Sequence, residues 1–242
     1  MPPRIQIAIN STGPPRPLRP PPFAFPDPCH ADAEGPVAWG GDFAPGTIIE
    51  AYRCGIFPWP HPQEERLWFS PDPRAVIPLN GLHISRRLAR TIAQQRFRVT
   101  LNAAFERVLH GCAGREGGTW ITPAYQRAYL RLHELGRAHS FETWTAEGAL
   151  AGGLYGVHLG GLFGAESMFH SARDASKVAM AAMVQHCGEV GVSLIDVQLL
   201  TPHLERMGAV EIPREDYLRR LYEVRDLPIR FCGTGTPDAR ES

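Results

Sequence analysis

Asp196 and Gln198 are the polar members of the segment 194–198, LIDVQ, whose other residues are typical of a buried strand. Side chains alternate along a strand, so we expect both to point to the same side. An unpaired carboxylate would be costly in such apolar surroundings. The two residues are therefore either a structural hydrogen-bonding pair or active-site groups at the end of a strand. Glu166 is a third candidate, because it follows the second strand of a glycine-rich hairpin, although its position alone assigns it no role.

Two tryptophans lie outside apolar strands. Trp59 is framed by prolines at 58 and 60, and Trp120 follows the sequence GGT at 117–119. Tryptophan is most often buried, so core packing is one interpretation. Placement in loops favours the other, in which the indole rings stack on a flat ligand such as an unpaired base.

Positive charge is concentrated in residues 73–104, which contain six arginines and neither aspartate nor glutamate. The six are Arg74, Arg86, Arg87, Arg90, Arg96 and Arg98. On the expected helix, Arg86 and Arg90 share a face and Arg87 lies beside them. Such a face is either simply solvated or suited to a phosphate backbone, whose contacts position a nucleic acid without reading its sequence.

The chain as a whole has 25 basic and 25 acidic side chains among 242 residues, and its formal net charge is zero. Proteins that bind nucleic acid are usually basic, so this balance taken alone argues against such a partner. The local excess of arginine removes that objection. Lys177 is the single lysine. Genomic composition bias explains this, while arginine is also the residue that binds phosphate in a bidentate geometry.

The sequence contains no GxSxG, Walker A, GxGxxG or HExxH motif, so the strong signatures of nucleophile, nucleotide and metal sites are missing. Its five cysteines include no CxxC pair and suggest neither a zinc site nor a disulfide framework. We therefore expect a reduced, cytoplasmic protein that uses no metal and no cofactor. Such a protein can still accelerate a reaction by positioning an activated substrate.

Helical and strand patterns alternate along the chain, which predicts an α/β fold. Helices are expected at 47–54, 85–94, 103–112, 123–135, 175–190 and 214–224, and strands at 97–100, 139–144 and 193–199. Ser85, Asn102 and Asp174 are the expected N-caps, and Gly136 and Gly191 are expected to end two of the helices.

Proline density divides the chain into four expected regions. Residues 1–24 form a Pro/Arg-rich extension typical of an extended or disordered segment, and 25–78 form a small N-terminal domain. Residues 79–230 form a second, larger domain, and 231–242 form a polar tail.

The segment 148–165 is uncharged and has glycines at 152, 156, 160 and 164, the GxxxG spacing of packed transmembrane helices. It is barely long enough to span a bilayer and contains His158. A hairpin fits better, with strands at 154–157 and 162–163 and a turn at 159–161. We expect no membrane association.

A series of short motifs resembles the leucyl/phenylalanyl-tRNA–protein transferase family. They include FPDP at 25–28, WGGD at 39–42, AYRCGIFPW at 51–59, SPDPRAV at 70–76, HISR at 83–86, GTWI at 118–121, LHELG at 132–136, ESMF at 166–169, ASK at 175–177 and LIDVQ at 194–198. Each motif alone is weak, but they occur in family order over most of the chain.

The resemblance implies an aminoacyltransferase that moves Leu or Phe from aminoacyl-tRNA to the α-amine of proteins with N-terminal Arg or Lys. Such a protein is thereby marked for degradation by the N-end rule. Met is a third donor to be tested. The implied fold is a small N-terminal domain followed by a GNAT acyltransferase-like domain, with a mixed sheet flanked by helices, in a monomer.

The resemblance also gives roles to individual residues. Trp59 and Trp120 match positions that hold the 3′-terminal adenosine of the tRNA. Arg86, Arg87 and Arg90 match a basic patch that faces the acceptor stem. The apolar pocket for the aminoacyl side chain is expected at or beside Leu154, Met168, Met180, Met183 and Ile195. Methionine suits a pocket that admits both Leu and Phe.

For the reacting centre, Asp196 matches a carboxylate proposed to polarise Gln198, whose side-chain oxygen would accept a hydrogen bond from the attacking amine. Glutamine does not titrate, so orientation describes its role better than general base. Glu166 is implied to help bind the substrate nearby. The aminoacyl ester is already activated, and about a tenth of an α-amine with a pKa of about 8 is neutral near pH 7.

Some positions depart from the family pattern. Phe69 stands in place of a usual tryptophan, Ala165 replaces a common glycine, and Thr201 replaces an asparagine of some members. Met180 and Met183 replace bulkier or branched residues. These changes affect the shape of the pocket, so they leave the preference between Leu and Phe open.

Two other functions compete with this interpretation. A CoA-dependent N-acetyltransferase would share the fold but should have an (Arg/Gln)-x-x-Gly-x-(Gly/Ala) pyrophosphate loop between a strand and a helix. The sequence matches this pattern once, as RFCGTG at 230–235, which follows the last expected helix instead of preceding one. The second alternative is an RNA-binding module without catalysis.

Overall fold

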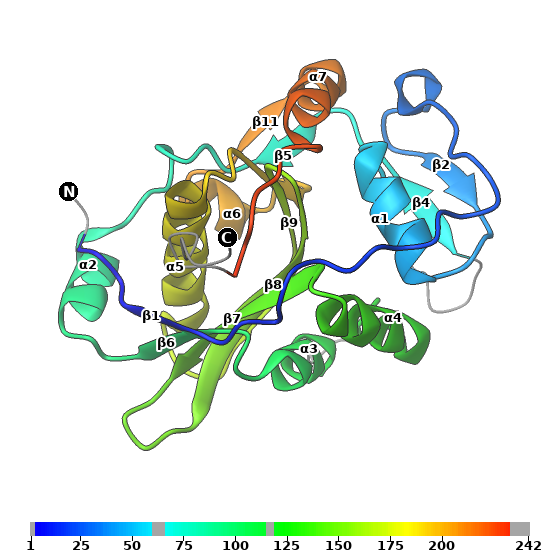
Figure 1. The fold of residues 1–242 in the computed structure, drawn as a ribbon. Coiled ribbons are helices and arrows are strands. Elements are labelled where there is room, and N and C mark those ends of the chain that lie inside the picture. The colour runs from blue at the N-terminus through cyan, green and yellow to red at the C-terminus, as the bar shows by residue number, and fades with distance from the viewer. Residues whose placement is uncertain (1–2, 60–65, 115–118, 233–242) are drawn as a thin grey trace, which may run out of the picture.

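An eight-stranded mixed sheet organises the part of the chain that the computed structural model describes, namely residues 3–59, 66–114 and 119–232 (Figure 1). In spatial order its strands are β1 (Ile7–Ile9), β6 (Arg98–Leu101), β7 (Ala138–Trp144), β8 (Leu150–Leu159), β9 (Leu162–His170), β10 (Leu194–Gln198), β5 (Arg74–Val76) and β11 (Val210–Ile212). β1 and β6 are parallel, as are β9 and β10, and the other neighbours are antiparallel.

Helices cover both faces of this sheet (Figure 1). They are α1 (Pro45–Arg53), α2 (Arg86–Ala93), α3 (Phe105–Ala113), α4 (Pro123–Glu134), α5 (Ala175–Val190), α6 (Pro202–Arg206) and α7 (Arg214–Val224). α5 lies on one face, and α3 and α4 lie on the other. Glycines in β8 permit this close approach. A Cβ at Gly152 would come within 2.9 Å of Ala175 in α5, and one at Gly153 within 2.9 Å of Val108 in α3.

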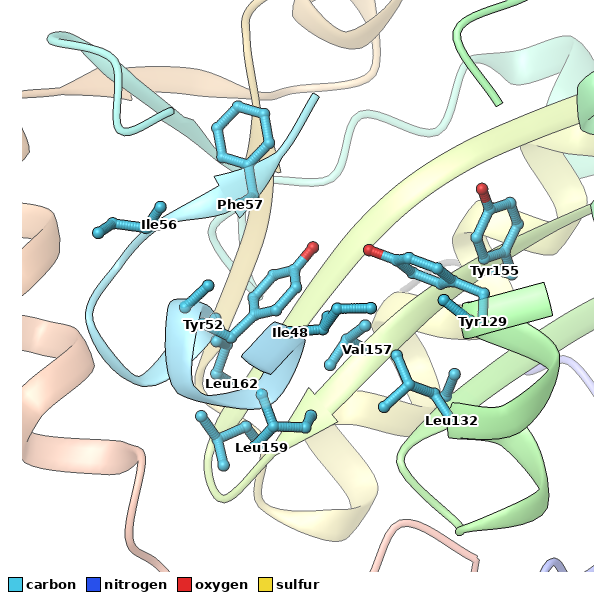
Figure 2. Close-up of a cluster of buried hydrophobic side chains, with 14 of the residues drawn as sticks. Ile48, Tyr52, Ile56, Phe57, Tyr129, Leu132, Tyr155, Val157, Leu159 and Leu162 are labelled. Atoms are coloured by element: carbon cyan, nitrogen blue, oxygen red, sulfur yellow. The ribbon is translucent and has the colours of Figure 1, made fainter. Parts of the chain in front are cut away.

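A smaller sheet of three antiparallel strands lies beside the large one, in the order β2 (Pro36–Trp39), β4 (Leu67–Phe69) and β3 (Phe57–Pro58). α1 joins the two units. Figure 2 shows Ile48 and Tyr52 of α1 within one apolar cluster with Val157 and Leu162 of the large sheet and Leu132 of α4. The small unit therefore shares its core with the large one.

A buried arginine in α7 fastens the small unit from the opposite side. The guanidinium of Arg214 donates hydrogen bonds to the backbone oxygens of Ala31 at 2.7 Å, Asp32 at 3.3 Å and Ser70 at 2.7 Å. A charge at this depth must be satisfied by acceptors, so the path of the chain around Ala31 and Ser70 is fixed relative to α7.

The predicted α/β class, with a mixed sheet flanked by helices, is confirmed. Ser85 caps α2 by accepting a hydrogen bond from the Leu88 amide at 3.2 Å, and Gly191 ends α5 with a φ of 90°. The segment 148–165 lies in the β8–β9 hairpin, as predicted. Among the described residues, no helix has both the length and the apolar character needed to cross a bilayer.

The expected N-cap at Asn102 is wrong. Its side chain instead accepts a hydrogen bond from the Ser140 amide at 3.1 Å, and its φ is 62°. Glu142, reaching over from β7, accepts hydrogen bonds from the amides of Ala103 at 3.2 Å and Ala104 at 3.3 Å at the start of α3. Asp174 does stand at the N-cap of α5, but its side chain makes no capping bond. At α3, therefore, the acceptor that caps the helix is Glu142, which is distant in the sequence, and not the adjacent Asn102.

Three of the expected regions contain features that composition did not indicate. The N-terminal extension includes β1, which pairs with β6 at the edge of the large sheet. β5 precedes the expected limit at residue 78, yet it belongs to the large sheet. Phe231, at the start of the expected polar tail, is buried, and residues 233–242 lie outside the described residues.

Glu142→Gln is expected to lower the free energy of unfolding by about 1–3 kcal/mol, because an amide nitrogen would replace one of the acceptor oxygens in a fully buried site. Urea denaturation measures this loss. Glu106→Gln, on the exposed side of the first turn of α3, is the matched control. Equal stabilities for the two variants would contradict the capping role.

Candidate active site

The site lies where the parallel strands β9 and β10 stop pairing. Their register runs from Leu194 opposite Leu162 to Asp196 opposite Gly164. Beyond this point β9 continues alongside β8 as far as His170. A cavity of about 810 Å³ is lined by residues beyond the last paired positions and by the β3 and α3 regions. Its lining includes Phe57, Trp59, Trp120, Glu166, Met168 and Gln198.

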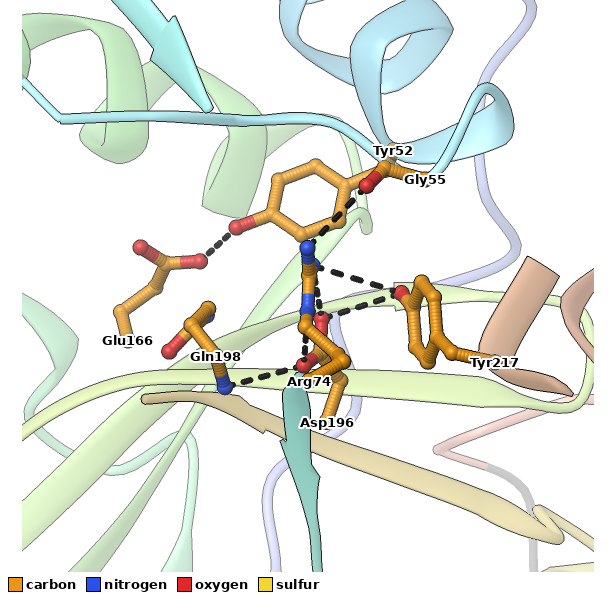
Figure 3. A network of polar contacts seen from close by, with 7 residues as sticks. All are labelled: Tyr52, Gly55, Arg74, Glu166, Asp196, Gln198 and Tyr217. Atoms are coloured by element: carbon orange, nitrogen blue, oxygen red, sulfur yellow. Dashed lines mark hydrogen bonds and ion pairs between the residues drawn. The ribbon is translucent and has the colours of Figure 1, made fainter. Parts of the chain in front are cut away.

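A buried bidentate ion pair contacts Gln198 of the cavity wall (Figure 3). Arg74 Nε and Nη2 donate to the two carboxylate oxygens of Asp196 at 2.9 and 2.6 Å, and both side chains are 0% exposed. Arg74 Nη1 donates to the Gly55 carbonyl at 3.1 Å. The Tyr217 hydroxyl donates to Asp196 Oδ2 at 3.1 Å. The rings of Phe57 and Tyr217 lie 4.8 and 4.4 Å from the guanidinium carbon.

The ion pair controls the protonation of its members. Burial alone would lower the pKa of Arg74, but attraction to Asp196 and the contact with Tyr217 raise that pKa above its ordinary value. Burial, and then the negative charge of Asp196, raise the pKa of the Tyr217 hydroxyl. Arg74 therefore remains charged and Tyr217 remains a neutral donor, so both stay fixed on the Asp196 carboxylate.

Gln198 follows a distortion of β10. The pairing of β10 with β5 shifts register between Asp196 and Gln198, and Gln198 has a φ of 61°, in the left-handed region. Its backbone amide donates to Asp196 Oδ1 at 2.9 Å. The side-chain Nε2 of Gln198 is buried at the cavity wall and has no hydrogen-bond partner among the described residues.

These contacts define how Asp196 and Gln198 meet. Asp196 does not line the cavity, and its bond to Gln198 goes to the backbone amide rather than to the side chain. Asp196 therefore holds the backbone of Gln198, and of the two only Gln198 lines the cavity. The regular alternation assumed for the strand fails because the ladder shifts register between these two residues.

Glu166 bridges the two units of the protein from the cavity wall. It accepts a hydrogen bond from the Tyr125 hydroxyl of α4 at 2.6 Å, and another from the Tyr52 hydroxyl of α1 (Figure 3). Burial, with a further contribution from the charge of Asp196, raises the pKa of Glu166 well above the ordinary glutamate value. The site thus holds a carboxyl group whose proton can be exchanged at higher pH than usual.

Trp59 and Trp120 both line the cavity, as the sequence led us to expect of residues that face a ligand. Trp59 is 38% exposed, and its ring meets Phe69 edge-on at 5.7 Å. The ring of Trp120 meets Tyr125 edge-on at 5.1 Å. These neighbours hold the indoles at the cavity while leaving surface for a ligand.

The expected aminoacyl pocket is only partly at the cavity. Met168 lines it, and Leu154 is its partner across the β8–β9 ladder. Leu154, Met180, Met183 and Ile195 are all buried in the core cluster around α5 and are not among the lining residues. These four side chains therefore belong to the core and not to the cavity wall.

The basic segment is not unopposed, because two of its arginines have partners elsewhere in the chain. Arg74 is buried against Asp196, and Arg87 Nη2 lies 2.7 Å from Asp174 Oδ1. Arg86 and Arg90 are exposed on α2. The excess of positive charge on this surface is smaller than the composition indicates.

Sequence reasoning missed Tyr52, Tyr125 and Tyr217, and it assigned Arg74 to the wrong environment. The tyrosines lie on apolar helical faces, where core packing is the ordinary expectation. Arg74 lies in the short strand RAV, all of it buried. A charged residue between apolar neighbours was the available signal, but the partner is 122 positions away.

The mixed sheet, the parallel strands β9 and β10 that stop pairing and the aromatic-lined cavity beside them define an α/β protein with a candidate ligand site. Two family models match the chain, Leucyl/phenylalanyl-tRNA protein transferase over residues 76–222 and the N-terminal domain of the same family over residues 41–72. The chain belongs to the leucyl/phenylalanyl-tRNA protein transferase family.

Relatives that bear this family name cover most of the chain. The protein of Anaeromyxobacter sp. strain Fw109-5 is 52% identical over 209 residues, which are 85% of this chain and 88% of that protein. The protein of Nitratidesulfovibrio vulgaris strain DP4 is 48% identical over 211 residues, 86% and 90% of the two chains. That of Klebsiella pneumoniae subsp. pneumoniae is 49% identical over 214 residues, 86% and 91%.

A solved structure of L-PGS from Bacillus licheniformis is similar at a TM-score of 0.36 and 13% identity, over 64% of this chain and 51% of that one. A TM-score of this size does not establish a common fold.

Glu166→Gln is expected to make the free energy of unfolding less dependent on pH. Since the folded state raises the pKa of Glu166 above 4.5, the wild type loses stability as pH rises from there toward the raised value. The amide of the variant does not titrate. Its free energy of unfolding should therefore rise relative to that of the wild type by about 1.4 kcal/mol for each pH unit between 4.5 and the raised pKa. Urea denaturation at a series of pH values measures the gain. Parallel pH curves for variant and wild type would show that Glu166 titrates as an ordinary glutamate.

Proposed function

We propose that this protein transfers leucine or phenylalanine from aminoacyl-tRNA to the α-amine of proteins that begin with Arg or Lys. The observation behind the proposal is that one cavity brings together Trp59, Trp120, Glu166 and Gln198 in a member of this family. Aromatic rings can stack on the terminal adenosine, and a carboxyl group can meet the incoming amine. An amide can donate a hydrogen bond to the ester carbonyl.

On the donor side, Trp59 and Trp120 provide stacking surfaces for the terminal adenine, and stacking on aromatic rings accepts any base. Met168 and Phe169 offer apolar surface for the aminoacyl side chain. The thioether chain of methionine adapts to different shapes, which fits a pocket that admits both leucine and phenylalanine.

At the reacting centre, the amine nitrogen attacks the ester carbonyl, a peptide bond forms, and the ester bond to the ribose oxygen breaks. The proton lost by the amine ends on the ribose hydroxyl. The amide of Gln198 has one acceptor for the attacking N–H and one unpartnered donor, Nε2, for the carbonyl oxygen that becomes negative. The amine attacks in its neutral form, so an acceptor that arrives as an ammonium first gives one proton to the carboxylate of Glu166, whose raised pKa favours that transfer.

Transfer of label from radiolabelled Leu-, Phe- and Met-tRNA to an Arg-initiated protein tests the proposal. Transfer with Leu- or Phe-tRNA is expected, and its absence at every concentration would refute the transferase. If the protein binds tRNA but transfers no label, it is an RNA-binding module. Release of free CoA from acetyl-CoA with a peptide acceptor would identify an N-acetyltransferase.

Substitutions in the cavity should separate binding from catalysis. Trp59→Ala is expected to weaken aminoacyl-tRNA binding by about 1–3 kcal/mol through loss of stacking. Gln198→Ala is expected to lower kcat by about 100-fold with little change in binding. Filter binding and single-turnover transfer measure the two effects. Trp39→Ala is the matched control, because Trp39 is 72% exposed and does not line the cavity. An equal loss of affinity in that variant would contradict the stacking role.

Replacing both Arg86 and Arg90 by alanine should weaken tRNA binding and flatten its dependence on salt, because fewer phosphate contacts release fewer counterions. Binding measured between 50 and 200 mM salt, about the range over which such contacts matter, gives the slope. The double replacement of Arg219 and Arg220, exposed on α7, is the control. If both double variants keep the wild-type slope, the tRNA does not bind along α2.

A further inference from the structure

A second cavity of about 320 Å³ adjoins the active-site cavity. His203 lines both cavities, so they meet at that side chain. The polar residues that line the second cavity come from α2, α5, α6 and the segment before α2; they are His83, Ser85, Arg87, Lys177, His203 and Arg206. We call it the basic cleft.

The basic cleft has more positive than negative charge. Arg87, Lys177 and Arg206 line it from three different helices. The facing carboxylate is Asp174, whose Oδ1 lies 2.7 Å from Arg87 Nη2 and 3.9 Å from Lys177 Nζ. One carboxylate does not neutralise three cations.

His203 responds to this charge. Its pKa is lowered by burial first, and then by the positive charges of Lys177, Arg206 and His170. A cationic cleft that disfavours a further proton is a favourable place for an anion.

The cleft is built on fixed backbone rather than on a loose surface. The His83 amide donates to the Met207 carbonyl at 2.9 Å, which ties the end of α6 to the segment before α2. Gly208 has a φ of 96°, and a Cβ there would lie 2.0 Å from the Gly81 carbonyl oxygen. Only glycine permits this approach. Ser85 begins α2 at the same cleft, and the first turn of a helix adds partial positive charge.

The chemistry and position of the cleft select its ligand. A cluster of guanidinium and ammonium groups binds phosphate, and the cleft continues the cavity in which the terminal adenosine is placed. The 3′ end of a tRNA is one continuous strand, so its backbone must leave that cavity beside its last nucleoside. We propose that the basic cleft binds the phosphate backbone of the single-stranded 3′ end of the donor tRNA. This inference rests on the proposed function.

Two small donors test the cleft. Phenylalanyl-adenosine has no phosphate, whereas a phenylalanyl-CCA trinucleotide has internal phosphates. The ratio of kcat/KM for the trinucleotide to kcat/KM for the adenosine ester isolates the phosphate contribution. Replacing both Lys177 and Arg206 by alanine is expected to lower this ratio by about tenfold or more, since hydrogen bonds to charged groups contribute about 1.5–3 kcal/mol each.

Asp174→Asn should change the ratio in the opposite direction. It removes the opposing charge, and asparagine tolerates the φ of 70° at this position, so the ratio should rise. Arg219→Ala, exposed on α7, is the control and should keep the wild-type ratio. A wild-type ratio in the Lys177/Arg206 double variant would overturn the proposal.

Binding of the unacylated CCA trinucleotide, measured by calorimetry with inorganic phosphate as competitor, gives a second readout that needs no transfer. Weaker binding of the trinucleotide by the double variant supports the cleft, and equal binding overturns it. If inorganic phosphate alone displaces the trinucleotide at equal concentration, the cleft is a site for a free anion and the proposal fails. If the wild type transfers phenylalanine from neither donor, the proposed function fails, while this binding experiment still decides the cleft.

Discussion

The buried ion pair between Arg74 and Asp196 is the interaction on which the rest of the site depends. Two charges without any exposed surface are costly unless every donor and acceptor is satisfied. Here the acceptors and donors come from different parts of the fold: Gly55 from the small unit, Tyr217 from α7 and the Gln198 amide from β10. Satisfying one ion pair therefore fixes these three segments relative to each other.

The conformation of Gln198 follows from this constraint. Its left-handed backbone is unfavourable for a residue with a side chain, and the bond from its amide to Asp196 compensates. The result is an amide group held at the cavity wall with one donor unpartnered among the described residues. Local strain of this kind is typical of sites that must present a group to a ligand. The ion pair thus bears on the cavity wall through Gln198.

Glu166 shows the conflict between stability and function in the same site. Two tyrosines, Tyr52 and Tyr125, hold it from different units, yet burial still raises its pKa. A carboxyl group that is easier to protonate stabilises the folded protein less at neutral pH. The same position gives the cavity a carboxyl group that takes up a proton at higher pH than an ordinary glutamate. The adjoining basic cleft, which meets this cavity at His203, is lined instead by the cations Arg87, Lys177 and Arg206.

The sequence by itself determined the α/β class, most helices and the hairpin, because hydrophobic period, caps such as Ser85 and helix-ending glycines are local signals. It also determined the family, because many short motifs occur in order. Only the tertiary structure decided that Glu142 replaces Asn102 as a cap, that Arg74 is the partner of Asp196, and that Met180 and Met183 lie in the core and not at the cavity wall. In each case the deciding contact joins residues far apart in the chain or on separate layers. Local preference cannot encode such contacts, because the cost of burying a charge or a polar group appears only when the layers close.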